Sequence, residues 1–387
     1  MNNYFALFGV NDLDTVPIEL QKKTLNILSH SEERTAQLKD LWGNWEYPFT
    51  TQPYNTPYLD FEVQKHIKNK KSIWPNNAPF AICLTHDIDH VSSSAHPNIA
   101  INNLSKKLMF STSINAKNQI RLQLLKQYLK KIITNVKSNE LWCYEKWLEL
   151  EASLGYKSTF FVFARPSSTK ELSIYDCDYT PNNEIVFDGI KMKVKDFWKE
   201  LHQRGFEVGL HGSYNSYNNE LILKKQKEII EESIGAEVIS TRQHFLHYDI
   251  HKTPETHKRT GIKVDSSLGF NRAIGFRAGT SFPYEILDEN GNGSGVWEIP
   301  QIIMDGALFT PNALELNVDL AVTHSLKIMD HVEQVGGCLT LNFHPEYINN
   351  EKYWTTYKLI LQEAKRRGAY NDTVGGIYNY IQNNFKK

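Results

Sequence analysis

Short apolar segments alternate with amphipathic helical segments along most of this chain, and this alternation limits the folds that it can adopt. From Pro79 onward, apolar runs such as FAICLTH (80–86) and STFFVF (158–163) are interspersed with helical patterns such as VKDFWKELHQRG (194–205). Such an order is typical of parallel strands joined by helical crossovers. Seven or more candidate strands favour a closed barrel over an open, doubly wound sheet. We therefore expect an α/β fold, a (β/α) barrel, over residues 76–387.

The first 75 residues have a different character. A helical pattern covers residues 17–42, and a stretch rich in aromatic residues and proline covers residues 44–61. We interpret residues 1–75 as a helical and irregular N-terminal extension. Three roles are open for it: binding a partner, capping the barrel, or forming part of the substrate cleft.

A helical insertion is predicted at about residues 99–139. Between 101 and 139 the sequence has eight basic residues and no acidic one, beside leucines and isoleucines at helical spacing. One interpretation is a helix that packs on the barrel and exposes its lysines to solvent. The other is a surface that contacts anionic lipid headgroups, as at a membrane surface, or an anionic, lipid-linked glycan carrier.

Composition argues against several classes of protein. The 43 basic and 44 acidic residues nearly cancel, which argues against a dedicated nucleic-acid binder. The four cysteines have no paired spacing, which argues against a disulfide scaffold or a four-cysteine zinc site. The N-terminus has no basic leader, and no apolar run is long enough for a membrane span, so we expect a cytoplasmic location.

The richest chemistry lies in LTHDIDH (84–90), directly after an apolar strand. Side chains alternate along a strand, so Asp87 and Asp89 project to the same face. Strand-end aspartates often cap a following turn. Two on one face, flanked by His86 and His90, fit that role poorly and instead indicate a site that holds a cation or a shared proton.

Further polar clusters follow other predicted strands. Because strand ends of a barrel converge, these clusters are expected to meet Asp87 and Asp89 at one site. Their main residues are His211, Tyr214 and Asn215 in LHGSYN, Arg242 and His244 in TRQHF, Asp265 in VDSSL, Arg277 in GFRAGTS, and His344 in LTLNFHP.

The order of these motifs resembles the polysaccharide deacetylase family, also called the NodB-homology domain, over residues 76 to about 385. THDID is similar to its first aspartate motif, LHGSYN to its histidine motif, and TRQHF to its arginine motif. VDSSL is similar to its fourth motif, and LTLNFHP to the strand that ends in the catalytic histidine. The resemblance implies a distorted (β/α) barrel and a divalent metal, usually zinc. It also implies removal of acetyl groups from N- or O-acetylated sugars.

The resemblance also suggests a role for each residue. Asp89 and His211 would bind the metal, which in the family is usually Zn²⁺, and Asp87 would be the general base. His344 would protonate the leaving group. Arg242 would orient Asp87, and Asp265 would hold His344 in its charged form. Arg277 and Tyr214 are candidates for binding the carbohydrate substrate.

The third metal ligand departs from the family pattern. Asn215 stands four residues after His211, where the family has a second histidine, and His244 stands where the family has a proline. Alternation places His244 on the same face as Arg242. One histidine is lost and another gained near the same cavity, so we predict Asp89, His211 and His244 as the metal ligands, with Asn215 as the alternative third ligand.

Three functions remain open from the sequence. The first is a metal-dependent deacetylase that acts on a precursor of a surface polysaccharide. The second is a catalytically silent barrel that binds glycan, which the Asn215 departure favours. The third is an amide hydrolase with a substrate other than a sugar.

Overall fold

The computed structural model describes residues 1–10, 12–40, 42–66, 71–91, 144–165, 173, 175–177 and 179–385. The helical insertion predicted at about 99–139, with its basic segment 101–139, lies outside the described residues. Among the described helices, none has both the length and the apolar character that crossing a bilayer requires.

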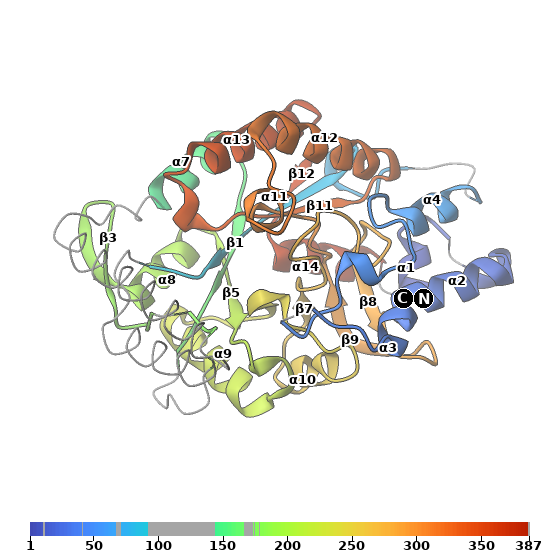
Figure 1. The fold of residues 1–387 in the computed structure, drawn as a ribbon, viewed down its shortest axis with the longest axis horizontal. Coiled ribbons are helices and arrows are strands. Elements are labelled where there is room, and N and C mark those ends of the chain that lie inside the picture. The colour runs from blue at the N-terminus through green and yellow to red at the C-terminus, as the bar shows by residue number, and fades with distance from the viewer. Residues whose placement is uncertain are drawn as a thin grey trace, which may run out of the picture.

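A curled ten-stranded sheet forms the centre of the molecule (Figure 1). Neighbouring strands are parallel, except that β8 and β9 form an antiparallel hairpin. In spatial order the path runs through β10 (Ile303–Met304), β11 (Cys338–Asn342), β1 (Ala81–Ile88), β2 (Ser158–Val162), β5 (Glu207–Gly212), β6 (Ser240–Gln243), β7 (Val264–Asp265), β9 (Gly293–Glu298) and β8 (Tyr284–Leu287). The short strand β12 (Tyr370–Asn371) also pairs with β1, and β3 (Glu184–Phe187) and β4 (Ile190–Lys193) form a separate hairpin.

The predicted barrel is formed only in part. Strands β10 and β8 end the path, and no pairing between described strands joins them. Helices α1 (Asn2–Ala6) and α2 (Ile18–Leu28) pack against β8, and Tyr4 lies in one apolar cluster with Tyr284. A covered edge strand does not need a further strand as its partner. The fold is therefore mixed α/β around a curled, open sheet, and a strict (β/α) barrel is not confirmed.

Amphipathic helices cover the outer face of the sheet (Figure 1). In α8 (Val194–Gln203), Val194, Phe197, Trp198 and Leu201 are buried, which is the spacing of one helical face. The other helices around the sheet are α7 (Tyr144–Ser153), α9 (Glu220–Ile234), α10 (Thr253–Arg259), α12 (Val318–Val335) and α13 (Glu351–Arg366). Helix α11 (Asp305–Phe309) follows β10, and α14 (Val374–Phe385) packs in one apolar cluster with inward-facing residues such as Cys83. The N-terminal region adds α3 (Ser31–Thr35) and α4 (Tyr58–Gln64).

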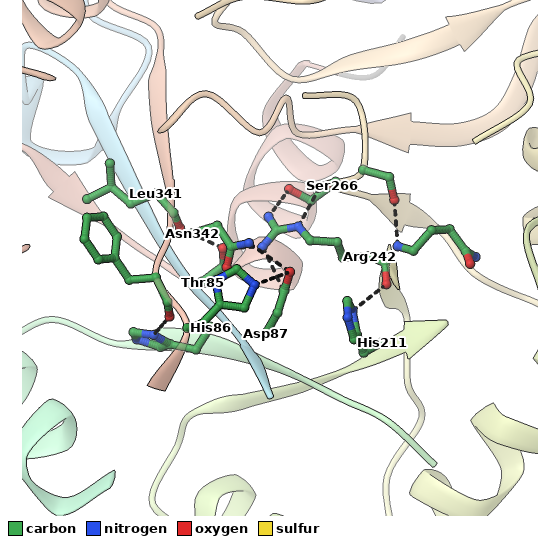
Figure 2. Close-up of polar contacts among 12 residues, drawn as sticks. Thr85, His86, Asp87, His211, Arg242, Ser266, Leu341 and Asn342 are labelled. Atoms are coloured by element: carbon green, nitrogen blue, oxygen red, sulfur yellow. Dashed lines mark hydrogen bonds and ion pairs between the residues drawn. The ribbon is translucent and has the colours of Figure 1, made fainter. Parts of the chain in front are cut away.

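Alternation along β1 separates a structural face from a functional one. His86 points outward, where its Nε2 lies 2.8 Å from Glu151 Oε1 and its Nδ1 lies 2.7 Å from the Phe343 carbonyl. Asp87 points to the inner side, toward Arg242 and Asn342 (Figure 2). The histidine beside the aspartates thus anchors the outer layer, and the carboxylates remain available inside.

Candidate active site

Three predicted metal ligands converge at the carboxyl ends of β1, β5 and β6. Asp89 follows β1, His211 belongs to β5, and His244 follows β6. Asp89 Oδ1 lies 3.2 Å from His211 Nε2 and 3.4 Å from His244 Nδ1, and the two nitrogens are 2.8 Å apart. Both imidazoles are buried, with 1% and 6% of their residue surface exposed.

The second nitrogen of each histidine faces a backbone carbonyl. His211 Nδ1 lies 2.9 Å from the carbonyl oxygen of Arg242, as Figure 2 shows, and His244 Nε2 lies 2.8 Å from that of Tyr175. A nitrogen that donates to a carbonyl leaves the other nitrogen of a neutral ring with a lone pair. Two such lone pairs and the Asp89 carboxylate then face one another, an arrangement that a proton or a cation must neutralise. A divalent ion fits this arrangement.

A fourth donor, Cys177, stands beside these three. Its Sγ lies 3.8 Å from Asp89 Oδ1, and the donor atoms of Asp89, Cys177, His211 and His244 all lie within 4.8 Å of one another. Imidazole, carboxylate and thiolate are the groups that bind Zn²⁺ in proteins. The spacing of the cysteines along the chain does not indicate Cys177 as a ligand, because each of these ligands comes from a different segment.

Asn215, the alternative third ligand, lies outside this cluster. It precedes the 3-10 helix Ser216–Asn218, its side chain is exposed, and it is not among the residues that line the cavity. The geometry therefore favours His244 over Asn215.

Asp87 is held in one orientation by two neighbours. Arg242 Nη1 donates to its Oδ1 at 3.1 Å, and Asn342 Nδ2 donates to its Oδ2 at 2.8 Å (Figure 2). Burial opposes ionisation of Asp87, but the charge of Arg242, with contributions from His211 and His344, outweighs it and places the pKa of Asp87 below its usual value. Asp87 is therefore a fixed, ionised carboxylate at neutral pH.

Arg242 is itself fixed by the strands around it. Its Nε donates to the Ser266 carbonyl at 2.7 Å, its Nη2 to Ser266 Oγ at 2.8 Å, and its Nη1 also to Thr85 Oγ1 at 2.6 Å. The guanidinium lies 4.7 Å from the centre of the Phe161 ring and is fully buried. Its place fits a residue that orients Asp87, the role that the family resemblance implied.

The His344 side chain faces both Asp87 and Asp89. Its Nε2 lies 3.7 Å from Asp89 Oδ2 and 4.0 Å from Asp87 Oδ2. Its Nδ1 lies 2.7 Å from Asp305 Oδ1, and its backbone N–H donates to Asp305 Oδ2 at 2.7 Å. Burial lowers the pKa of His344, but Asp305 and Asp89 outweigh burial and raise it well above its usual value. This shift favours the protonated form of His344, and its Nε2 faces the two aspartates.

Asp265, which was predicted to hold His344, does not contact it; the carboxylate beside His344 is Asp305. Asp265 Oδ1 accepts from the Ser266 N–H at 2.8 Å and from Ser267 Oγ at 2.6 Å, and burial raises its pKa to about 7. Four strands separate β7, which carries Asp265, from β11, which precedes His344. Asp305 directly follows β10, the neighbour of β11, so strand order explains why Asp305 takes this place.

We expect Asp305→Asn to lower kcat by on the order of 10- to 100-fold, the usual effect of losing a group that holds a site residue. Without the negative charge the pKa of His344 falls, so the alkaline limb of the pH–kcat profile should move to lower pH. Asp265→Asn should leave that limb in place. If Asp265→Asn moved the limb and Asp305→Asn did not, the assignment would be overturned.

Arg277, predicted to bind substrate, is instead a structural residue. Its Nη2 donates to Glu33 Oε1 at 2.6 Å, and its Nη1 donates to the Gly269 carbonyl at 3.0 Å. The side chains of Arg277 and Glu33 are both buried. It is not among the residues that line the active-site cavity, whereas Arg272 is. The cavity-side arginine of this segment is therefore Arg272.

Removing the Arg277 side chain should test this correction. Arg277→Ala leaves Glu33 buried without its partner, so we expect the free energy of unfolding to fall by about 3–5 kcal/mol. Denaturant unfolding measures this loss, and Glu33→Gln should lower stability as well. Unchanged stability together with a raised KM would instead restore the predicted substrate role.

Tyr214 lies behind the residues that line the cavity and contacts one of them, Trp42. Its hydroxyl donates to the Trp42 carbonyl at 2.7 Å, and its ring stacks on His247 with centres 4.1 Å apart. Tyr214 does not line the cavity, but Trp42 does. Substrate binding by Tyr214 stays a prediction, and in this structure Trp42 is the residue of the pair that reaches the cavity.

A cavity of about 780 Å³ opens over these groups. Trp42 lies against Phe245 on its wall, with ring centres 5.1 Å apart and planes 29° apart. The N-terminal region contributes to this wall, so the third of its open roles, forming part of the cleft, has structural support. The lining residues are Lys39, Asp40, Trp42, Asp87, Asp89, His211, His244, Phe245, Leu246, Asn271, Arg272, Met304, Gly306, Thr310, Pro311, Asn312 and His344.

Comparison with solved structures identifies the fold. A structure from Mycobacterium smegmatis, described as a polysaccharide deacetylase, matches with a TM-score of 0.51 and 17% identity, over 80% of this chain and 92% of that one. An allantoinase matches with a TM-score of 0.50 and 12% identity, over 82% of this chain and 95% of that one. No protein-family model and no curated protein matches the sequence. The resemblance to polysaccharide deacetylases that the motifs indicated is thus confirmed at the level of the fold.

Proposed function

We propose that this protein is a metal-dependent hydrolase that removes an acetyl group from an N- or O-acetylated sugar. One observation carries the proposal. Asp89, His211 and His244 form a three-ligand cluster, and the side chains of Asp87 and His344 stand beside it among the residues that line one cavity. A carbohydrate-binding protein without catalysis needs neither a base nor an acid at such a cluster.

Asp89, His211 and His244 would hold the divalent metal, and their nitrogen and oxygen donor atoms suit Zn²⁺. When bound, such an ion supplies a Lewis acid for the acyl oxygen and lowers the pKa of a coordinated water toward neutrality. The carbonyls of Arg242 and Tyr175 fix the two imidazole rings, so the ligands are oriented before any ion binds.

Asp87 would take the proton of the attacking water. It is fixed by Arg242 and Asn342, and each carboxylate oxygen retains a further lone pair after accepting one hydrogen bond. Its lowered pKa keeps it ionised at neutral pH, the state that a base requires.

His344 would donate a proton to the departing amine or alcohol. Asp305 binds its Nδ1 and directs Nε2 toward the site, and the raised pKa keeps the ring protonated. Amine and alkoxide are poor leaving groups without a proton, so the acid and the base together account for both halves of an acyl transfer to water.

The walls of the cavity fit a sugar ring. Trp42 and Phe245 offer aromatic surface, and Lys39, Asn271 and Arg272 offer polar groups that can bind hydroxyls or an acidic substituent. The cavity therefore combines an apolar surface for one face of the ring with polar groups around it.

Hydrolysis of a non-sugar amide is the second candidate function. The likeness to an allantoinase favours it, since one fold can carry related hydrolytic sites for different substrates. A catalytically silent, glycan-binding protein was favoured by Asn215, which stands in place of a metal-binding histidine. His244 lies 2.8 Å from His211 and can supply that nitrogen, which weakens the argument for a silent protein.

Two measurements on the purified protein test the proposal. We expect about one equivalent of zinc per chain by elemental analysis, and release of acetate from at least one member of a panel of N- and O-acetylated sugars. Chelation should abolish release and added Zn²⁺ should restore it. Turnover only of cyclic or linear amides without a sugar would favour the second candidate, and binding of sugars without turnover would favour the silent one.

A further inference from the structure

Cys177 is a buried thiol beside the proposed metal ligands that the mechanism above does not use. It is 3% exposed, and its Sγ lies 3.8 Å from Asp89 Oδ1. Sγ, one Asp89 oxygen and one nitrogen each of His211 and His244 lie within 4.8 Å of one another. Since metal–ligand bonds are about 2.0–2.3 Å long, four donors at such separations can reach a common ion.

The segment that carries Cys177 is bound to all three strands that supply the other ligands. The Tyr175 carbonyl faces His244 Nε2 at 2.8 Å, and Asp176 Oδ1 accepts from the backbone N–H of Tyr214, shortly after His211, at 2.6 Å. The Tyr179 hydroxyl donates to the carbonyl of Ile88, next to Asp89, at 2.8 Å. These contacts fix the position of the thiol relative to each of the other ligands.

The other described cysteines have a different environment. Cys83 and Cys338 lie fully buried in the apolar cluster inside the sheet, where burial raises the pKa of both thiols. The Cys177 thiol instead faces a carboxylate and two imidazoles, the groups with which a cysteine shares a zinc ion. Cys177 also borders an apolar cluster, but its Sγ faces the Asp89 carboxylate, whereas Cys83 and Cys338 lie in the cluster inside the sheet.

We propose that Cys177 Sγ is the fourth protein ligand of the ion held by Asp89, His211 and His244. This inference rests on the metal site of the proposed function and adds a thiolate to it. On binding, the S–H proton leaves for solvent and the sulfur lone pair forms the bond to the metal. A thiolate selects Zn²⁺ or Co²⁺ over Mg²⁺ and Mn²⁺. Zinc can take a fifth ligand, which leaves room for a water beside four protein donors.

Cobalt substitution tests the proposal with a readout that does not depend on turnover. Co²⁺ bound through a thiolate has an intense sulfur-to-metal charge-transfer band in the near ultraviolet, besides its visible ligand-field bands. We expect both sets of bands in the unmodified protein. Cys177→Ser should lose the charge-transfer band, keep ligand-field bands, and bind Co²⁺ at least about tenfold more weakly. Cys338→Ala, which removes a buried thiol elsewhere, should retain the complete spectrum.

X-ray absorption at the zinc edge of the unmodified protein needs no variant. It should show one sulfur scatterer at about 2.3 Å, together with nitrogen and oxygen scatterers at about 2.0–2.2 Å. A shell of nitrogen and oxygen alone would overturn the role of Cys177 and leave the proposed hydrolase intact. Failure of the unmodified protein to bind Zn²⁺ or Co²⁺ would overturn both proposals.

Discussion

Asp87→Asn is expected to lower kcat by about 10²–10⁴-fold while the zinc content stays close to one equivalent per chain. The amide keeps the size of the carboxylate but cannot take the proton of the attacking water. Asp87 is not one of the four clustered donors, so its loss should not empty the metal site. Elemental analysis and initial rates on the same sample measure both effects.

Two further variants test whether Asp87 acts as a base and not as a metal ligand. Asp89→Asn should lose zinc and turnover together, because Asp89 lies within contact distance of both metal-site histidines. Asp265→Asn makes the same chemical change at another buried strand end and should alter turnover far less. Equal loss of zinc in Asp87→Asn and Asp89→Asn would contradict the division of roles between base and ligand.

The stability of Asp87→Asn needs its own measurement, because Arg242 would lose its buried counter-charge. Arg242 is fully buried and faces Asp87 at 3.1 Å. Removing one partner of a buried ion pair typically costs about 3–5 kcal/mol of stability. A thermal melt that shows a folded variant at the assay temperature separates loss of the base from loss of the fold.

Local patterns predicted the order of strands and helices but not the closure of the sheet. Alternating apolar runs identify parallel strands: β1 and β2 form where FAICLTH and STFFVF predicted them, and β5 and β11 lead into the LHGSYN and LTLNFHP motifs. Whether such strands close into a barrel depends on contacts between distant segments. Here α1 and α2 cover β8, and nothing in the local pattern of residues 284–287 indicates that cover.

The residues of the candidate site also fall into those that the sequence predicts and those that it does not. Asp87, Asp89, His211, Arg242 and His344 stand at strand ends, and carboxyl ends of parallel strands meet, so the sequence was sufficient to bring them together. The predicted contact of Asp265 with His344 and the predicted substrate contact of Arg277 are not seen. The position of a residue at a strand end or in a motif does not reveal which side chains surround it. Asp305 and Cys177 belong to none of the sequence motifs above, so only the three-dimensional arrangement identifies them.

His244→Ala is expected to weaken zinc binding by at least about 100-fold, because it removes a donor nitrogen from the centre of the cluster. His244 Nδ1 lies 2.8 Å from His211 Nε2 and 3.4 Å from Asp89 Oδ1. Competition with a chelator of known affinity measures the change. At limiting zinc, turnover should fall in parallel, and excess zinc should restore part of it.

Asn215→Ala is the matched control for this variant, since Asn215 stands at the spacing where the family pattern has its second histidine. The Asn215 side chain is exposed and outside the cavity, so the substitution should leave zinc affinity within about twofold, which is less than 0.5 kcal/mol. The difference between the two variants decides whether the ligand has moved from the strand β5 loop to the end of β6. A zinc-bound structure with both ring nitrogens of His244 well beyond about 2.5 Å from the ion would refute that move, because zinc–nitrogen bonds are about 2.0–2.1 Å long.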